Sequence, residues 1–125
     1  MDGPDHAPKP VVLVVEDEWL VRFHAVEMIE EAGFVALEAA NADEAVAILE
    51  ARDDVRVMFT DIDMPGSMDG LKLARAVRNR WPPVKIIVTS GQRVAAADDL
   101  PEGGRFFGKP YDVREVTRTM RQLIA

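Results

Sequence analysis

Runs of aliphatic residues constrain the fold of this chain more than any other feature of its sequence. Residues 11–15 read VVLVV, and residues 84–89 form a second, largely apolar segment. A strand that is apolar on both faces is typical of a parallel sheet whose two sides are covered by other elements. The sequence therefore predicts a buried parallel sheet that contains both segments.

Segments with helical periodicity follow the strands. Apolar residues recur at helical spacing from Leu20 to Ala32, and Gly33 then stands where a helix commonly stops in a left-handed conformation. Asn41 and Asp69 are expected to cap two further helices. Residues 93–100 predict a weaker and more mobile helix, because their alanine-rich face offers little to bury. An apolar stripe over residues 113–124 predicts the last helix.

Three further strands complete the pattern, at residues 34–39, 55–60 and 105–107. About five strands that alternate with about five helices indicate an α/β fold, with an open parallel sheet flanked by helices on both faces and right-handed crossovers. In such sheets, ligands bind outside the carboxyl ends of the strands. The side chains that follow each strand are therefore the candidates for a site.

Composition excludes several classes of protein. A length of 125 residues fits one domain, and 15 basic against 22 acidic residues give a net charge of −7, which argues against nucleic-acid binding. The absence of cysteine rules out disulfides and Cys-ligated zinc, and two histidines make a His-rich metal site improbable. No apolar run approaches the roughly 20 residues that span a bilayer. Residues 1–10 carry acids and prolines and are expected to form a disordered leader, which fits a cytoplasmic protein without a secretory signal.

Polar residues gather at the predicted carboxyl ends. Glu16 and Asp17 follow the first strand, Asp61 the third, Thr89 ends the fourth and Lys109 follows the fifth. Each has an ordinary explanation by itself, as a helix cap, a turn residue, a strand former or a solvated cation. Their convergence on one rim has none, because clustered carboxylates repel one another unless a cation or a proton holds them together.

Oxygen ligands without nearby cysteine or histidine suit Mg²⁺, which typically binds through one or two carboxylates, waters and a phosphoryl oxygen. Lys109 would supply a second positive charge to such a phosphoryl group, and the hydroxyl of Thr89 a hydrogen bond. Phosphoryl transfer to a carboxylate needs an in-line nucleophile and charge neutralisation, and little else. The residues therefore predict Mg²⁺-dependent phosphorylation of an aspartate.

The order of these residues resembles the receiver domain of two-component response regulators. An acidic pair follows the first strand, a strand-end aspartate precedes Met64-Pro65 and Asp69-Gly70, and a lysine–proline pair follows the fifth strand. The resemblance covers nearly the whole chain, and residues 11–125 would form the domain. It implies a flavodoxin-like sheet in the strand order 2-1-3-4-5.

The resemblance also implies a role for each residue of the site. Asp61 would be the phosphoacceptor, which takes the group from a histidine kinase or a histidine phosphotransfer protein. Asp17 and Asp61 would bind Mg²⁺ directly, Glu16 through a water and Asp63 through its backbone carbonyl. Lys109 would contact the phosphoryl oxygens.

Two more positions would report the phosphorylated state. Thr89 would turn towards the phosphoryl group after transfer, and Phe106, three residues before Lys109, resembles an aromatic switch that packs inward in the active state. Sequence alone leaves the choice between Phe106 and Phe107 open, because adjacent strand residues face opposite ways. Phosphorylation would then change the affinity of a face made by residues 93–100, residues 105–107 and the last helix.

The chain departs from the family pattern beside Asp61. The loop of residues 64–70 is one residue longer than usual, and Ser90 stands where alanine or glycine is common. The phosphoryl lifetime therefore does not carry over from the family. Glu16 replaces a second aspartate, a tolerated change because the longer side chain still reaches a metal-bound water.

The resulting prediction is a signalling module that takes part in its own phosphorylation and dephosphorylation and is otherwise no enzyme. The chain ends after the last helix, so the signal is expected to pass to an unknown downstream protein unless the chain is a fragment. A phosphorylation-dependent homodimer is left open. An alternative is a Mg²⁺-dependent phosphohydrolase with an aspartyl nucleophile, but that nucleophile normally ends the first strand. A flavin carrier is disfavoured, because no Ser/Thr-rich phosphate loop follows the first strand.

Overall fold

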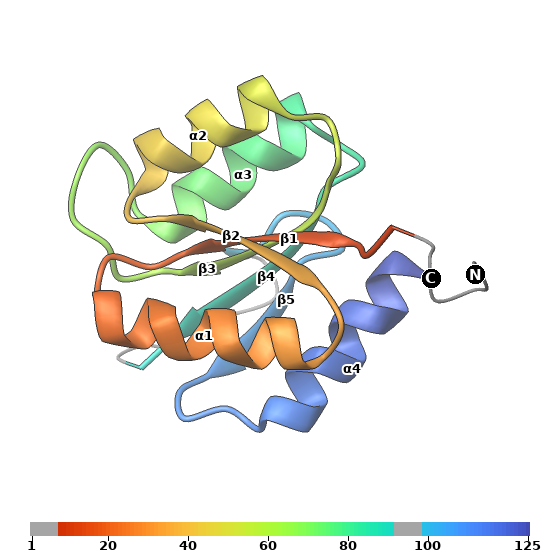
Figure 1. Cartoon of the computed structure of the whole chain (residues 1–125). Helices are drawn as coiled ribbons and strands as arrows, with labels where there is room; N and C mark the ends of the chain where they lie inside the picture. The colour runs from red at the N-terminus through yellow and green to blue at the C-terminus, as the bar shows by residue number, and fades with distance from the viewer. Residues whose placement is uncertain (1–7, 92–98) are drawn as a thin grey trace.

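The computed structural model describes residues 8–91 and 99–125 (Figure 1). This part of the chain forms five strands and four helices. The elements in chain order are β1 (Val11–Val15), α1 (Trp19–Glu31), β2 (Val35–Ala39), α2 (Ala42–Ala51), β3 (Val55–Asp61), α3 (Gly70–Arg80), β4 (Lys85–Ser90), β5 (Arg105–Gly108) and α4 (Val113–Ile124).

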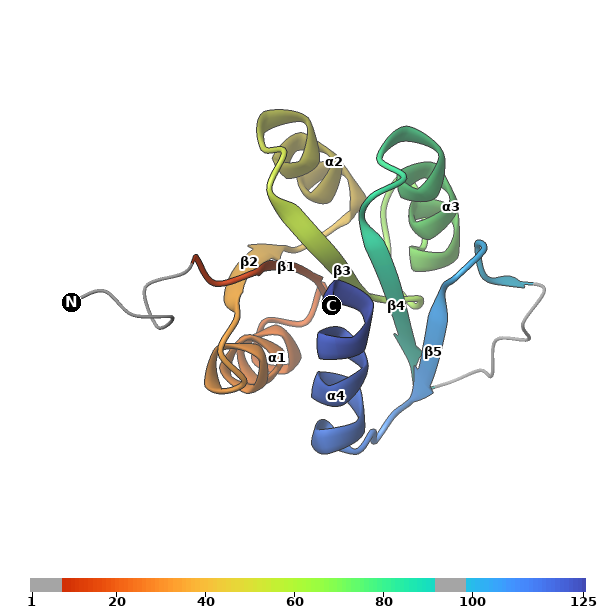
Figure 2. The same ribbon diagram turned by 90° about the vertical axis from the view of Figure 1, so that its right-hand side faces the viewer.

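All neighbouring strands are parallel, and the sheet has the order β2-β1-β3-β4-β5. Helices α1 and α4 cover one face, and α2 and α3 cover the other (Figure 2). The structure therefore confirms the predicted α/β class and the predicted strand order. Because the chain reverses its direction of winding after β2, β1 and β3 lie side by side in the middle of the sheet.

The burial of β1 explains its unbroken aliphatic sequence. Val12 and Val14 pack into the core beneath α1 and α4, whereas Val11, Leu13 and Val15 pack into the core beneath α2 and α3. All five side chains are buried. A polar residue on either face of this strand would lose its hydration without gaining a partner, so both faces must be apolar.

Local signals fix the helix ends as the sequence predicts. The side chain of Asn41 accepts a hydrogen bond from the backbone N–H of Glu44 at 2.9 Å, and that of Asp69 accepts from Lys72 at 3.0 Å. Gly33 has φ 98°, the left-handed conformation that closes α1. These three residues set where α2 and α3 begin and where α1 ends.

Two strands begin one residue later than the hydrophobic pattern predicts. The N–H of Phe34 donates to the carbonyl of Ile29 in the turn that follows α1. The N–H of Val84 donates to the carbonyl of Trp81 in the turn after α3. The predicted helix at residues 93–100 and the predicted leader lie largely outside the described residues.

Helix α3 begins against the backbone of the residue that ends β3. The N–H of Gly70 donates to the carbonyl of Ile62 at 3.0 Å, and a Cβ atom at position 70 would overlap the backbone carbonyl oxygen of Asp61. No residue other than glycine fits this approach without moving the strand. Gly70 therefore allows the start of α3 to lie directly against the backbone of Asp61.

Replacing Gly70 with alanine is expected to lower the free energy of unfolding by about 2 to 3 kcal/mol, because the added methyl group forces α3 away from β3. Denaturant unfolding followed by circular dichroism measures the loss. Gly108→Ala is the matched control, since nothing lies within 4 Å of a Cβ built there. Equal stability of the two variants would contradict the close approach at Gly70.

Candidate functional site

The two central strands bring acidic residues from distant parts of the chain together. In the register of β1 and β3, Val15 is paired with Thr60, so Glu16 and Asp61 follow on neighbouring strands at the same edge. One oxygen from each of Glu16, Asp17 and Asp61 lies within 4.8 Å of the others. Glu16 and Asp61 are buried, and Asp17 is exposed. The predicted acidic cluster is therefore present.

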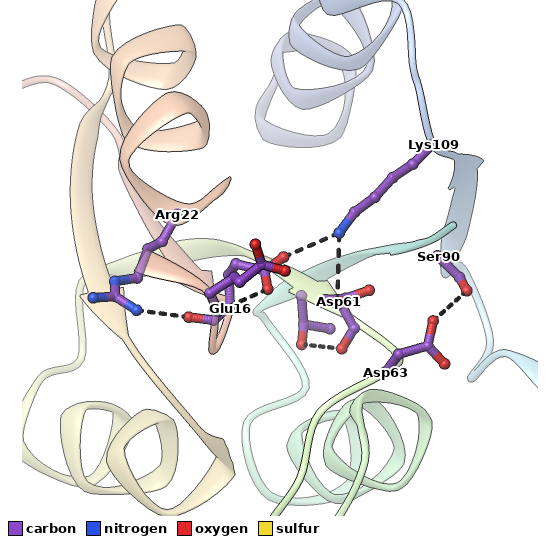
Figure 3. Close-up of polar contacts among 8 residues, drawn as sticks. Glu16, Arg22, Asp61, Asp63, Ser90 and Lys109 are labelled. Atoms are coloured by element: carbon purple, nitrogen blue, oxygen red, sulfur yellow. Dashed lines mark hydrogen bonds and ion pairs between the residues drawn. The ribbon is translucent and has the colours of Figure 1, made fainter. Parts of the chain in front are cut away.

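Lys109 lies above this cluster (Figure 3). Its Nζ is 3.0 Å from Oε1 of Glu16 and 3.5 Å from Oδ2 of Asp61. The N–H of Lys109 donates to the carbonyl of Ser90 at 2.9 Å, which holds the residue beside the end of β4. The lysine therefore reaches across β3 to the carboxylate that follows β1.

Burial has the largest influence on the pKa values of the two buried carboxyl groups, those of Glu16 and Asp61. Burial raises the pKa of Glu16 above its ordinary value of 4.5, against the hydrogen bonds from Glu18 and Lys109. Burial also raises the pKa of Asp61 above its ordinary value of 3.8, against the charge of Lys109. Lysine 109 therefore offsets only part of the cost of burying these two charges.

The pKa of Lys109 moves in the direction that its partners dictate. Burial by itself lowers this pKa, but the hydrogen bond to Glu16 and the charges of Asp61 and Glu16 outweigh it, so the pKa is raised. The ammonium group is therefore charged throughout the physiological range. A permanent cation at this place is available to an anionic group that enters the site.

One oxygen of the cluster fits a further cation. Among the described residues, Oδ1 of Asp61 is a buried side-chain oxygen without a hydrogen-bond partner. An unpaired carboxylate oxygen in the interior is costly. Three carboxylates within 4.8 Å of one another offer the hard oxygen donors that Mg²⁺ prefers. The donor set and its geometry therefore fit a divalent cation.

Thr89 and Tyr111 complete the floor of the site. Both line a small cavity together with Glu16, Asp61 and Lys109. The hydroxyl-bearing Thr89 is buried and is paired in register with Asp61. The ring of Tyr111 packs edge-on against Phe59 with centroids 5.7 Å apart, and burial raises the pKa of its phenol. Tyr111 was not predicted as a site residue, although it stands two positions after Lys109.

The two phenylalanines of β5 face opposite sides of the sheet. Phe106 packs against the core beneath α2 and α3, and Phe107 packs against the core beneath α1 and α4. Both are partly buried. Phe106 therefore lies on the same face of the sheet as Val88, the residue before Thr89.

Arg22 supports Glu16 from the other side and was not predicted. Its guanidinium donates to the backbone carbonyl of Glu16 at 2.8 Å (Figure 3). It also donates to the side chain of Glu38 at 3.1 Å. The guanidinium of Arg22 thus links Glu16, which follows β1, to Glu38 in β2. No pattern in the sequence indicated this contact, because the helical periodicity around Arg22 is the same whether its guanidinium faces water or Glu16.

Asp63 is joined to the end of β4. The hydroxyl of Ser90 donates to Oδ2 of Asp63 at 2.6 Å. Asp63 is not among the three carboxylates that lie close enough to share an ion. Its predicted role, through the backbone carbonyl, stays a prediction.

This fold and this site together define a flavodoxin-like α/β protein with an acidic centre, crossed by one lysine, at the carboxyl edge of its sheet. Within residues 8–91 and 99–125, none of the helices is long and apolar enough to cross a bilayer. Similarity to known proteins identifies the family within this class.

The sequence matches the family of response regulator receiver domains over residues 12–121. Sensor kinase CckA of Brucella abortus (strain 2308) is 33% identical over 124 residues, which cover 96% of this chain and 13% of CckA. Response regulator receiver protein CpdR of the same strain is 28% identical over 116 residues, which cover 90% of this chain and 95% of CpdR. A solved response regulator receiver protein from Pseudomonas putida has a TM-score of 0.82 and 30% identity, covering 93% of this chain and 98% of that one.

The chain belongs to the response regulator receiver domain family and is a receiver domain of two-component signalling. This finding confirms the resemblance drawn from the sequence. Domains of this family take phosphoryl groups from histidine kinases or phosphotransfer proteins.

The raised pKa of Asp61 predicts a pH-dependent cost in stability. A carboxyl group with a raised pKa in the folded state contributes its full stability below its unfolded pKa, and this contribution is lost as the pH rises through the folded value. Asparagine mimics the protonated form. In buffer without divalent cations, Asp61→Asn is therefore expected to raise the free energy of unfolding at pH 7 by about 1 kcal/mol.

Denaturant unfolding at several pH values checks this expectation, and the gain should disappear below about pH 4, near the ordinary aspartate pKa. Asp54→Asn is the control and should change the free energy of unfolding at pH 7 in the opposite direction. The hydrogen bond from Arg52 lowers the pKa of that exposed carboxyl. A destabilised Asp61→Asn at pH 7 would show that burial does not raise the pKa of Asp61.

Proposed function

We propose that Asp61 is the phosphoacceptor of this receiver domain. The observation that carries the proposal is the position of its carboxylate, which ends β3 at the ligand-binding edge, within 3.5 Å of Lys109 and inside the acidic cluster. An oxygen of Asp61 forms the new O–P bond while the P–N bond to the donor's phosphohistidine breaks. The departing imidazole nitrogen keeps the electron pair of that bond.

The other residues of the site position and neutralise the transferred group. Glu16, Asp17, Asp61 and the backbone carbonyl of Asp63 would hold Mg²⁺, Glu16 through a water. When bound, Mg²⁺ would offset the negative charge that develops on the phosphoryl oxygens. The Lys109 ammonium then exchanges part of its contact with the carboxylates for one with those oxygens.

Thr89 and Phe106 form the proposed switch. The hydroxyl of Thr89 donates to the phosphoryl group after transfer, and the space that it leaves allows Phe106 to pack inward. Thr89 is buried, and Phe106 is partly buried on the neighbouring strand, where it is paired with Val88, the residue before Thr89. The phosphorylated state then changes the affinity for an unknown downstream protein. Part of the predicted output face lies outside the described residues.

The proposal includes the boundaries and setting of the domain. Residues 11–125 form the receiver, which acts in the cytoplasm and catalyses reactions only on its own phosphoryl group. The competing phosphohydrolase has no specific support, since Asp61 ends β3 and not β1, where the nucleophile of that class is normally found.

Stoichiometric labelling of Asp61 is the direct test. Incubation with a small phosphodonor and Mg²⁺ should give an acid-stable, base-labile label that is absent from Asp61→Asn and from samples with excess chelator. Asp63→Asn is the matched control and should retain the label, because only its backbone carbonyl is assigned to the site. Rapid multiple turnover of phosphate esters would support the phosphohydrolase instead.

We further propose that the phosphodonor protein docks on the first turns of α1. Trp19, Leu20 and Phe23 are 68%, 48% and 49% exposed, and they begin two residues after Asp17. Apolar side chains gathered on a surface are typical of protein interaction sites. A donor that rests on them places its phosphohistidine beside the acidic cluster.

Phe23→Ala is expected to slow transfer from a phosphorylated histidine kinase or phosphotransfer protein about tenfold, as truncation of an interface aromatic residue does. Labelling by a small phosphodonor should stay unchanged, because the site itself is intact. The control is Val35→Ala, which removes an exposed apolar side chain at the other end of the sheet. Equal slowing with both kinds of donor would contradict docking on α1.

A further inference from the structure

Arg22 contacts the acidic cluster through the backbone and not through a carboxylate. Nη1 of its guanidinium donates to the backbone carbonyl of Glu16 at 2.8 Å (Figure 3). Nε donates to a carboxylate oxygen of Glu38 at 3.1 Å, on the neighbouring strand β2. The arginine side chain is only 20% exposed, so the planar guanidinium is held between two parts of the fold. Its charge is paired with Glu38, and its contact with Glu16 fixes a piece of backbone.

The carbonyl that Arg22 holds belongs to the peptide bond between Glu16 and Asp17. Because a peptide unit is planar, the direction of the Glu16 carbonyl also fixes the N–H and the Cα atom of Asp17. Within residues 8–91 and 99–125, no backbone N–H donates to this carbonyl, so the guanidinium supplies its hydrogen bond. Arg22 therefore restrains the orientation of the peptide that carries Asp17.

Asp17 needs this restraint more than the other two carboxylates do. Glu16 is anchored through its side chain, since Oε1 accepts a hydrogen bond from Lys109 at 3.0 Å and Oε2 accepts one from the N–H of Glu18 at 3.1 Å. Asp61 is buried at the end of a strand. Asp17 is exposed and lies after the end of β1, yet one of its oxygens is within 4.8 Å of an oxygen from each of the other two. The place of this exposed carboxylate depends on the backbone that carries it.

We propose that Arg22 is a positioning residue for the divalent-cation site, because it orients the Glu16–Asp17 peptide and so holds the Asp17 carboxylate where it can share an ion with Glu16 and Asp61. The inference rests on the Mg²⁺ binding of the proposed function and adds a residue that is not itself a ligand. Glu38 anchors the guanidinium and neutralises its charge, so Arg22 does not repel the cation that it helps to bind. Partners that orient metal ligands typically raise metal affinity about ten- to a hundredfold.

The sign of the effect separates positioning from simple electrostatics. A positive charge near a cation site repels the ion, so the loss of Arg22 would by charge alone tighten Mg²⁺ binding. Loss of the restraint acts in the opposite direction, because Asp17 must then be ordered when the ion binds. Arg22→Met keeps an unbranched apolar side chain and removes the donors. It is expected to weaken Mg²⁺ binding about tenfold.

Titration of the full, isotope-labelled chain with Mg²⁺ measures this affinity through the NMR signals of the amides of residues 16–18. Arg22→Lys keeps a donor and the charge and should bind Mg²⁺ more tightly than Arg22→Met, whereas repulsion alone predicts the reverse order. Arg52→Met is the matched control, because it removes the same charge from an exposed pair with Asp54 that precedes β3, at the opposite edge of the sheet. It should keep the affinity of the wild type.

Two further readouts separate positioning from a general loss of folding. In the Mg²⁺-free protein, the backbone order parameter of Asp17 should fall below about 0.6 in Arg22→Met, the range of flexible backbone. At saturating Mg²⁺, the rate at which a small phosphodonor labels Asp61 in this variant should equal that of the wild type, because enough ion restores the same site. A partly unfolded chain would instead label slowly at every Mg²⁺ concentration.

Each contrary result has a distinct meaning. An Arg22→Met chain that binds Mg²⁺ as tightly as the wild type, or more tightly, would overturn the inference and leave the proposed function intact, as would an Asp17 amide that stays rigid. A wild-type chain that binds no Mg²⁺ at the acidic cluster would overturn the proposed metal site and the inference with it. Mg²⁺ binding without any labelling of Asp61 would overturn the assignment of the phosphoacceptor alone.

Discussion

The contact of Lys109 with Glu16 and Asp61 is the interaction on which the site depends. Two buried carboxylates on neighbouring strands repel each other, and without a cation between them one would take up a proton. The ammonium group lies 3.0 Å from one and 3.5 Å from the other, and it comes from the far side of β3. Their raised pKa values show that this single charge does not offset the burial of both. The site therefore has more negative charge than Lys109 neutralises, and this excess favours the binding of a divalent cation.

Much of this arrangement follows from the sequence because simple rules govern it. Unbroken aliphatic strands demand a sheet covered on both faces, so β1 had to be buried on both of its sides. Parallel strands bring their carboxyl ends to one edge, so residues 16, 17, 61, 89 and 109 had to converge. The caps at Asn41 and Asp69 depend on short-range hydrogen bonds and were readable for the same reason.

What the sequence does not contain is the direction of individual side chains. Phe106 and Phe107 both suit a strand, and only the register with β4 decides which core each one enters. Arg22 lies on a helix whose periodicity is the same whether the guanidinium faces water or Glu16. The Ser90–Asp63 bond joins residues 27 positions apart, and neither residue type by itself indicates a partner. Tertiary contacts of this kind require coordinates.

The closure of the loop after β3 has a consequence for how this protein tolerates change. The carbonyl of Ile62 accepts hydrogen bonds from Met64 and Gly70, so the base of the loop is tied on both sides, while Pro65, Gly66 and Ser67 are exposed. Length variation between these anchors would bulge into solvent and leave the strand end undisturbed. The tip of this loop is accordingly a suitable place to graft an epitope or a fluorescent reporter without displacing the end of β3.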